Sequence, residues 1–314
     1  MRIACVQYAP ELGRVAQNAE RVRALTASLK PDQVDLLVLP EMALTGYMFD
    51  SLEEISPLLE NPYTGEGATS VLAADLARHL QCHVVAGFPE RASPRALEEL
   101  GSRGQHDARI AREKVTGLAH LPRIERQAFN AAMLVGPDGS LVKVFRKHFL
   151  YEADTTWADE GSGFEYLDVP GLGRICVAIC MDLNPYTLES EFSRYELATY
   201  CEQHRIDCLV VPMNWLLPED DIEAYQAQTS SSDPSLATIN YWVARCMPLW
   251  MPGLCQPGHE GHTTYLVACN RTGVERDIVF AGSSSVIAFT YADRADLLGT
   301  TGARTEGTLV VHTA

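Results

Sequence analysis

The chain has 314 residues, of which 46% are hydrophobic, so it is long enough to bury a sizeable core. Its 41 acidic residues outnumber its 25 basic residues and give a formal net charge of −16 at pH 7. Because such a surface repels phosphate backbones and anionic lipid, we expect no nucleic-acid partner and no membrane binding.

The first part of the chain alternates short apolar strands with amphipathic helices. Residues 2–8 are a predicted strand, and residues 17–29 are a predicted helix with apolar side chains at helical spacing. A second strand over 35–39 is apolar throughout, as in strands that are buried on both faces. A helix over 68–80 and a strand over 82–87 continue the alternation.

Residues 91–127 interrupt this alternation. They are rich in Arg, Glu, Gly and Ala, contain two prolines and show only weak helical periodicity. We predict a surface insertion over this range. No Ser/Gly/Pro-rich linker or internal repeat divides the chain, so we expect a single domain over 1–314.

A hairpin follows the insertion. Predicted strands over 129–135 and 141–145 flank residues 136–140 (GPDGS), whose Gly, Pro and Asp favour a tight turn. Further strands are predicted over 164–169, 174–179, 207–211, 264–269, 284–290 and 308–312.

Two longer helices are predicted in the second half, over 188–203 and 234–246. The latter opens with Asp233 as a cap and Pro234 at the first helical position. The mixture of hairpins and strand–helix units predicts an α/β protein with two mixed β-sheets and helices on both outer faces. This arrangement is a four-layer α-β-β-α sandwich.

Three chemically active side chains stand just past predicted strands: Glu41, Lys147 and Cys180. A carboxylate, an ammonium and a thiol at strand ends can supply a proton shuttle, an oxyanion stabiliser and a nucleophile. Together they are suited to cleaving a carbon–nitrogen bond through a thioester. Each residue alone also has a structural interpretation, since a cysteine that ends an apolar strand is usually a core residue. Spacing alone does not decide between the two.

The chain has nine cysteines, and several of them lie in apolar runs where a thiol acts as a small hydrophobe. None of them has the spacing of a zinc site, so we expect no metal and no other cofactor. The N-terminal segment has the pattern of a strand rather than of a signal or transit peptide. We expect a reducing compartment, which is the cytoplasm, with the nucleus as a further candidate.

Four short motifs succeed one another along the chain. They are residues 40–47 (PEMALTGY), 87–90 (GFPE), 146–150 (RKHFL) and 180–183 (CMDL). In this order they closely resemble the signature motifs of the nitrilase, or carbon–nitrogen hydrolase, superfamily, and only 91–127 falls outside the resemblance. The resemblance implies a nitrilase-like α-β-β-α sandwich and a Glu41–Lys147–Cys180 triad.

Many members of this superfamily use a second glutamate after the lysine, which orients the substrate or shares the proton transfer. Glu152 and Glu160 both stand at a suitable place. We favour Glu152 as the fourth catalytic residue because it lies about one helical turn beyond Lys147. Glu160 stays as the alternative.

The residues after Cys180 bear on the substrate. Branches of the superfamily that act on small acids commonly carry an arginine at the position of Asn184, where it suits a substrate carboxylate. The missing cation argues against that mode and favours a substrate with a cationic group. A small-molecule aliphatic amidase, ω-amidase or nitrilase of the same superfamily remains the alternative.

Several stretches resemble the fungal protein N-terminal amidase branch of the superfamily. They are residues 180–186 (CMDLNPY), 147–151 (KHFLY) with Trp157, 212–216 (PMNWL), 241–245 (YWVAR), 270–273 (NRTG) and 282–285 (GSSS). Enzymes of this branch convert N-terminal Asn or Gln of polypeptides to Asp or Glu with release of ammonia, which feeds the N-degron pathway. The resemblance implies that polypeptide N-termini bearing Asn or Gln are the partners of this chain.

Such a substrate makes two demands on the pocket. Its side-chain amide must reach Cys180, and its α-ammonium needs a carboxylate or several carbonyl acceptors, because an unpaired buried ammonium is costly. We expect Asp182 or Glu152 near the ammonium, although a structural role for Asp182 is equally supported. The residues expected around the pocket are Tyr47, Asn184, Asn214 and Trp215.

Two questions stay open at the level of the sequence. A nitrilase-like scaffold that binds partners without catalysis is the alternative of another class, and the intact triad disfavours it. The oligomeric state is also open, because superfamily members often form homodimers through their helical layer. An insertion over 91–127 would block or extend that surface.

Overall fold

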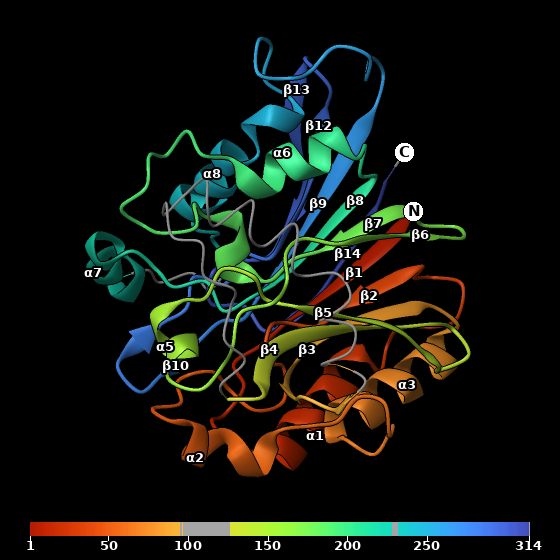
Figure 1. Ribbon diagram of the computed structural model, residues 1–314, viewed down its shortest axis with the longest axis vertical. Helices are drawn as coiled ribbons and strands as arrows, with labels where there is room; N and C mark the ends of the chain where they lie inside the picture. Colours follow the sequence, from red (N-terminus) through yellow and green to blue (C-terminus); the bar gives the residue numbers. More distant parts are fainter. Residues whose placement is uncertain (95, 97–125, 228–231, 314) are drawn as a thin grey trace.

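The computed structural model describes residues 1–94, 96, 126–227 and 232–313. Two mixed sheets of six strands each lie at its centre (Figure 1). The first has the order β14-β1-β2-β3-β4-β5, in which β1, β2 and β3 are parallel and the other neighbours antiparallel. Its strands are β1 (Arg2–Gln7), β2 (Leu36–Val38), β3 (His83–Arg91), β4 (Ala128–Val135), β5 (Leu141–Arg146) and β14 (Gly307–His312).

The second sheet has the order β13-β12-β9-β8-β7-β6. Here β7, β8 and β9 are parallel, and the flanking strands pair antiparallel. Its strands are β6 (Tyr166–Val169), β7 (Gly173–Val177), β8 (Cys208–Met213), β9 (Thr263–Asn270), β12 (Ser285–Thr290) and β13 (Arg294–Thr300). A separate ribbon joins β10 (Val274–Glu275) to β11 (Ile278–Val279).

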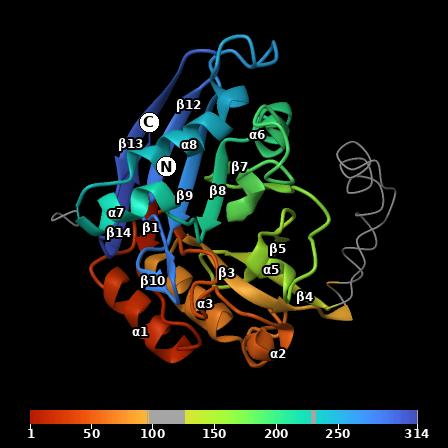
Figure 2. The ribbon, with the colours of Figure 1, turned by 90° about the vertical axis from the view of Figure 1, so that its left-hand side faces the viewer.

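Helices lie on the outer face of each sheet (Figure 2). Because successive side chains of a strand point to opposite faces, Ala4 of β1 packs with Val22 of the first helix, whereas its neighbour Ile3 packs in a core shared with Val210 of β8. The predicted four-layer α-β-β-α sandwich is therefore confirmed. The helices are α1 (Val15–Thr26), α2 (Leu52–Ile55), α3 (Ala68–Leu80), α5 (Glu152–Thr155), α6 (Glu196–Gln203), α7 (Glu219–Ala227) and α8 (Leu236–Arg245).

The predicted helix over 188–203 is wrong in its first half, because only α6 is helical. The guanidinium of Arg245 donates hydrogen bonds to the main-chain carbonyls of Phe192 and Arg194. A helix starting at residue 188 would use these carbonyls internally. The buried arginine thus favours a loop over the residues that precede α6.

The start of one helix and the presence of one strand also differ from the prediction. Helix α8 is capped by Ser235 rather than Asp233: the Ser235 hydroxyl accepts a hydrogen bond from the Thr238 N–H at 3.3 Å. The Ser235 N–H donates to Ser283 Oγ at 2.8 Å, which ties the cap to the second sheet. Strand β13 was not predicted, because its sequence (RADLLGT) lacks the two-residue alternation of a half-buried strand.

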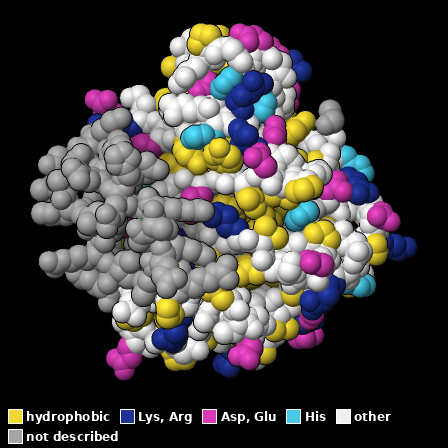
Figure 3. All heavy atoms as spheres, turned by 45° about the vertical axis from the view of Figure 1, so that its right-hand side comes forward, with side chains coloured by type: hydrophobic (Ala, Val, Ile, Leu, Met, Phe, Trp, Pro, Cys, Tyr) yellow, Lys and Arg dark blue, Asp and Glu magenta, His cyan; other side chains and the backbone are white. Residues whose placement is uncertain are grey.

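The predicted turn over 136–140 is confirmed, since it joins β4 to β5 and the Gly136 N–H donates to the Ser140 carbonyl at 2.9 Å. The predicted insertion over 91–127 lies almost wholly outside the described residues. On the face seen in Figure 3, acidic and basic side chains are interspersed. Among the described residues, no helix has the length and apolar character needed to cross a bilayer.

Candidate active site

The three predicted catalytic residues follow strand ends at one edge of the molecule. Strand β5 runs in the same direction as β2, because β3 is parallel to β2 and the hairpins through β4 reverse the chain twice. Glu41 and Lys147 therefore leave the first sheet at the same edge. Cys180 and Asn214 follow the parallel strands β7 and β8 of the second sheet. Such carboxyl ends are where α/β sheets place their ligand sites.

The ammonium of Lys147 lies between two carboxylates. Its Nζ is 2.8 Å from Glu41 Oε1 and 2.6 Å from Asp154 Oδ2, and all three side chains are fully buried. Asn130 joins the two acids, because its Nδ2 donates to Glu41 Oε1 at 2.7 Å and to Asp154 Oδ1 at 2.8 Å. The network fixes the lysine and the predicted base, Glu41, in one geometry.

The position of Glu41 depends on a glycine in the neighbouring strand. A Cβ at Gly87 of β3 would lie 2.5 Å from the Cα of Glu41, which is closer than any side chain tolerates. The Ala43 N–H donates to the Gly87 carbonyl at 2.9 Å and holds the loop against the strand. Only glycine lets the main chain of the catalytic loop approach β3 so closely.

Cys180 begins a short 3₁₀ turn, Cys180–Leu183, directly beyond β7. Its φ is +42°, a left-handed conformation that a residue with a Cβ adopts only when its surroundings enforce it. The residue is only 7% exposed. The N–H of Asn214 donates to Glu41 Oε2 at 2.7 Å and also contacts the Cys180 thiol. One main-chain group thus brings the carboxylate and the thiol together.

The buried charges shift the pKa values of the three groups. Burial raises the pKa of Glu41, and Lys147 opposes this shift. Burial works against the charge of Lys147, but Asp154 and Glu41 outweigh it and raise the pKa of the lysine. Burial, followed by the charge of Glu41, raises the pKa of Cys180 well above its ordinary value. The free site therefore holds a protonated thiol beside a carboxylate, which suits general-base activation.

Asp182 connects the lysine loop to the nucleophile turn. Its Oδ1 accepts hydrogen bonds from the N–H groups of His148 at 3.0 Å and Phe149 at 2.7 Å, and its Oδ2 accepts from Ile179 at 2.8 Å. Burial raises the pKa of Asp182 to about 7, against the lowering effect of these three N–H groups. The contacts favour a bracing role over the alternative of binding an ammonium.

Of the four predicted pocket residues, Tyr47 and Asn214 contact the cluster, whereas Asn184 and Trp215 contact Tyr241. Tyr47 is buried, and its hydroxyl donates to Asp154 Oδ2 at 3.2 Å. Asn184 Oδ1 accepts from the Tyr241 hydroxyl at 2.7 Å. Trp215 is half-buried, and its ring centroid lies 5.6 Å from that of the same tyrosine. Asn214 is the residue whose N–H joins Glu41 to the thiol.

The expectation for the second carboxylate needs correction. Glu152 is the first residue of α5 and its side chain is exposed, so it lies outside the buried cluster. Asp154, two residues later, points inward and contacts Lys147. The alternative, Glu160, accepts a hydrogen bond from the Tyr186 hydroxyl at 2.7 Å. The acid that follows the lysine in this site is therefore an aspartate.

Sequence reasoning missed two residues of the cluster, Asp154 and Asn130. Asp154 was overlooked because only glutamates were considered after Lys147, although an aspartate one turn into a short helix reaches the same place. Asn130 lies on the inward face of β4, and a polar residue in that otherwise apolar strand is the signal that marks it. A buried polar side chain needs partners, so its presence in a core strand points to a polar site.

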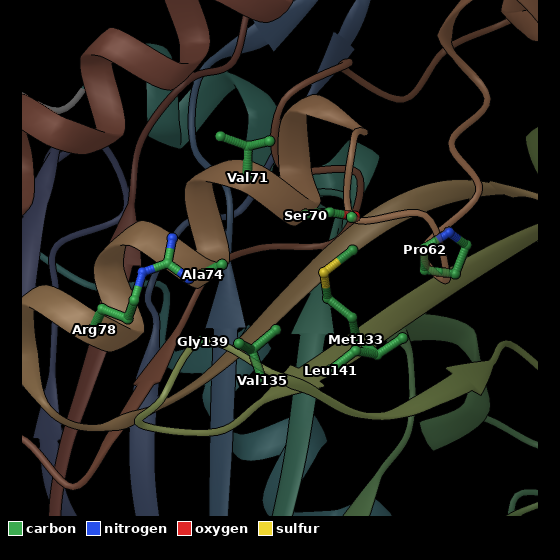
Figure 4. Close-up of a pocket in the computed structure, with 10 residues that line it drawn as sticks. Pro62, Ser70, Val71, Ala74, Arg78, Met133, Val135, Gly139 and Leu141 are labelled. Carbon is green, nitrogen blue, oxygen red and sulfur yellow. The ribbon is translucent and has the colours of Figure 1, made fainter.

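Two further features lie outside this cluster. Within the described ranges, no group of three His, Cys, Asp or Glu side chains is arranged to hold a metal ion. A surface cavity of about 260 Å³ lies between α3 and the β4–β5 hairpin and contains none of the triad residues (Figure 4). Its lining includes Arg78, Met133 and Leu141.

Comparisons with known proteins place this chain in a family. Residues 2–185 match the carbon–nitrogen hydrolase family. The protein N-terminal amidase of Schizosaccharomyces pombe is 30% identical over 324 residues, which cover 99% of this chain and 98% of the relative. The protein N-terminal amidase of Saccharomyces cerevisiae is 24% identical over 238 residues, which cover 69% of this chain and 45% of the relative.

Solved structures share the fold. The crystal structure of an N-terminal amidase with a Gln-Gly peptide has a TM-score of 0.76 at 20% identity and covers 99% of this chain and 96% of its own. A structure of the same kind with an Asn-Glu peptide has a TM-score of 0.76 at 18% identity, with the same coverage. The chain belongs to the carbon–nitrogen hydrolase family and is a hydrolase of carbon–nitrogen bonds, similar over nearly its whole length to a fungal protein N-terminal amidase.

Proposed function

We propose that the protein deamidates N-terminal Asn and Gln residues of polypeptides to Asp and Glu, with release of ammonia. The observation that carries this proposal is the buried Glu41–Lys147 pair beside the Cys180 thiol, joined through the Asn214 N–H. The full-length similarity to a protein N-terminal amidase supports this choice of substrate.

The first half of the reaction forms a thioester. Glu41 takes the thiol proton while Cys180 Sγ attacks the carbon of the substrate's side-chain amide. The resulting oxyanion is stabilised by Lys147 and a main-chain N–H of the nucleophile turn. Hydrogen bonds to Glu41 and Asp154 use two of the three N–H groups of the lysine, which leaves one for the oxyanion. Collapse of the intermediate breaks the carbon–nitrogen bond, and Glu41 returns the proton to the departing ammonia.

The second half hydrolyses the thioester. A water molecule enters where ammonia left, and Glu41 takes one of its protons as its oxygen attacks the thioester carbon. The carbon–sulfur bond breaks, the proton passes to Cys180, and a carboxylic acid leaves. In this account Asp154 keeps Lys147 charged, and Tyr47, Asn184 and Trp215 shape the pocket that receives the substrate side chain.

The biological setting is a further part of the proposal. Conversion of Asn to Asp at an N-terminus changes an uncharged terminal side chain to a charged one, which suits a step in the N-degron pathway. All nine cysteines are unpaired in the structure, which accords with a reducing compartment such as the cytoplasm.

The proposal is tested by ammonia release from two amide classes. We expect a far higher kcat/KM on peptides that begin with Asn or Gln than on glutaramate-like small acids, because the pocket lacks an arginine at Asn184. Replacement C180A should abolish turnover without changing the melting temperature. Faster hydrolysis of the small acids would identify a small-molecule amidase instead, and activity in C180A would refute the nucleophile.

A further inference from the structure

Asn214 carries a buried side-chain amide that lacks a partner. Its Oδ1 and its Nδ2 both have no hydrogen-bond partner among the described residues, although the residue is only 2% exposed. An unsatisfied buried polar group destabilises the folded state. Native proteins carry few such groups, and each needs an explanation.

The other asparagines of the site use their amides within the protein. Asn130 Nδ2 donates to both carboxylates of the cluster. Asn270 accepts from the Trp215 N–H at 2.8 Å and donates to the Gly282 carbonyl at 2.9 Å. Asn184 is bonded to Tyr241. Asn214 alone among these four leaves both ends of its amide unpaired, so its side chain is not needed to build the site.

The main chain of Asn214 lies beside the groups that are proposed to react. Its N–H contacts both Glu41 and the Cys180 thiol. The side-chain oxygen of an asparagine is four bonds from its own nitrogen. In an Asn substrate the α-nitrogen is three bonds from the carbon that the thiol attacks. The side-chain oxygen of Asn214 and the α-nitrogen of the substrate therefore lie at similar distances along their chains from the Cys180 thiol.

We propose that the Asn214 carboxamide reads the free N-terminus of the substrate, with Oδ1 accepting from the α-ammonium and Nδ2 donating to the carbonyl of the first peptide bond. This inference rests on the proposed function and identifies the group that recognises the substrate end. A carboxamide presents an acceptor and donors side by side, and an N-terminal residue presents the complementary pair. Binding gives a partner to both ends of the Asn214 amide, which have none within the described residues.

An uncharged side chain as the partner of the α-ammonium suits the electrostatics of this site. Two buried carboxylates already face one ammonium, and Glu41 and Asp154 both raise the pKa of the Cys180 thiol. A further carboxylate as the ammonium partner would raise this pKa again. The α-ammonium of the substrate instead adds the positive charge that the cluster lacks, so its arrival favours the thiolate. The charge of the N-terminus thus contributes to its own reaction as well as to binding.

The test compares a free peptide that begins with Asn-Gly with its N-acetylated form, by ammonia release. The wild-type protein is expected to prefer the free peptide in both kcat and KM. In the isosteric variant N214L, kcat/KM on the free peptide should fall about 10- to 100-fold and on the acetylated peptide far less, so that the preference collapses. N214D keeps an acceptor, so the preference should remain while the rising limb of its pH–rate profile moves to higher pH.

The control variant is T264V, which also replaces a buried polar group by an apolar isostere. Thr264 donates to the Ile206 carbonyl at 2.7 Å, at the end of β9 that is remote from the site. It should keep the wild-type preference. A wild-type preference in N214L, or an equal fall on both peptides, would refute the reading role of Asn214. If the wild-type protein releases no ammonia from the free peptide, the proposed function itself fails.

Discussion

Lys147 is the residue on which the buried charges converge. A lone ammonium at full burial is unstable, and the pair of carboxylates from Glu41 and Asp154 is what keeps it charged. The same pair raises the pKa of Cys180, so the cluster stabilises the oxyanion donor at the expense of thiol ionisation. In the proposed mechanism, general-base transfer to Glu41 resolves this conflict, because the thiol need not ionise before the substrate arrives.

Replacing Asp154 tests which acid supports the lysine. In D154N one negative charge is lost beside Lys147, so its pKa should fall and kcat should drop about 10- to 100-fold. The matched variant E152Q changes an exposed side chain two residues away and should keep kcat within about twofold of wild type. Steady-state kinetics on an Asn-initiated peptide decide the matter. A loss in E152Q with none in D154N would restore Glu152 as the catalytic acid.

The sequence allowed a catalytic triad to be proposed but not its full set of contacts. Glu41, Lys147 and Cys180 were predicted from their positions after apolar strands and from the motifs around them, and the strands do bring all three to one edge. Asp154 depends on how the single turn of α5 presents its side chains, which no periodicity reveals. The unpaired amide of Asn214 is likewise visible only when every neighbouring polar group is in place.

The loops that carry the triad are held by contacts between elements rather than by their own propensities. Asp182 ties the residues after Lys147 to the residue before Cys180 through three main-chain N–H groups. Gly87 lets the Glu41 loop lie against β3. These contacts hold the main chain around Cys180 and sustain its left-handed φ.

Replacing Asp182 tests this brace. In D182N the NH2 group of the new amide would face either the Ile179 N–H or the N–H groups of His148 and Phe149. Either orientation leaves main-chain donors without an acceptor, so the unfolding free energy should fall by about 1–3 kcal/mol. Activity should fall with it because the nucleophile turn is released. Urea denaturation midpoints, measured beside the rates, check both effects. Unchanged stability with lost activity would favour substrate binding by Asp182.

The loss of unfolding free energy in D182N should depend on pH in a definite direction. The folded-state pKa of Asp182 is about 7, above its ordinary value, so the folded protein binds the proton more tightly than the unfolded chain does. The stability that this proton supplies is complete below about pH 4 and is lost as the pH rises through 7. The deficit of D182N relative to wild type should therefore be larger at pH 5 than at pH 8, and the reverse order would contradict the shift.

Element boundaries show where local sequence patterns were overridden. The hairpin over 136–140 formed as predicted because its turn residues determine it locally. The residues before α6 are not helical, since Arg245, which is distant in the sequence, donates hydrogen bonds to two of their main-chain carbonyls. Strand β13 was not predicted, because it lies at a sheet edge and its apolar and polar residues do not alternate regularly.

At the scale of the whole molecule, the site exists only where the two sheets meet. The first sheet supplies Glu41 and Lys147, and the second supplies Cys180 and Asn214. The hydrogen bond from the Asn214 N–H to Glu41 spans the two sheets at this point. If this is the active site, as we propose, a variant that loosens the core between the sheets should lose catalysis before it loses secondary structure.

The central claim is that Cys180 forms a thioester with the side chain of an N-terminal Asn or Gln. Rapid acid quenching during turnover of an Asn-initiated peptide, followed by mass spectrometry, tests it directly. We predict an adduct of the peptide minus ammonia on the fragment that contains Cys180, and its release by hydroxylamine. Steady ammonia release with no adduct on that fragment, or with the adduct on another residue, would contradict the account.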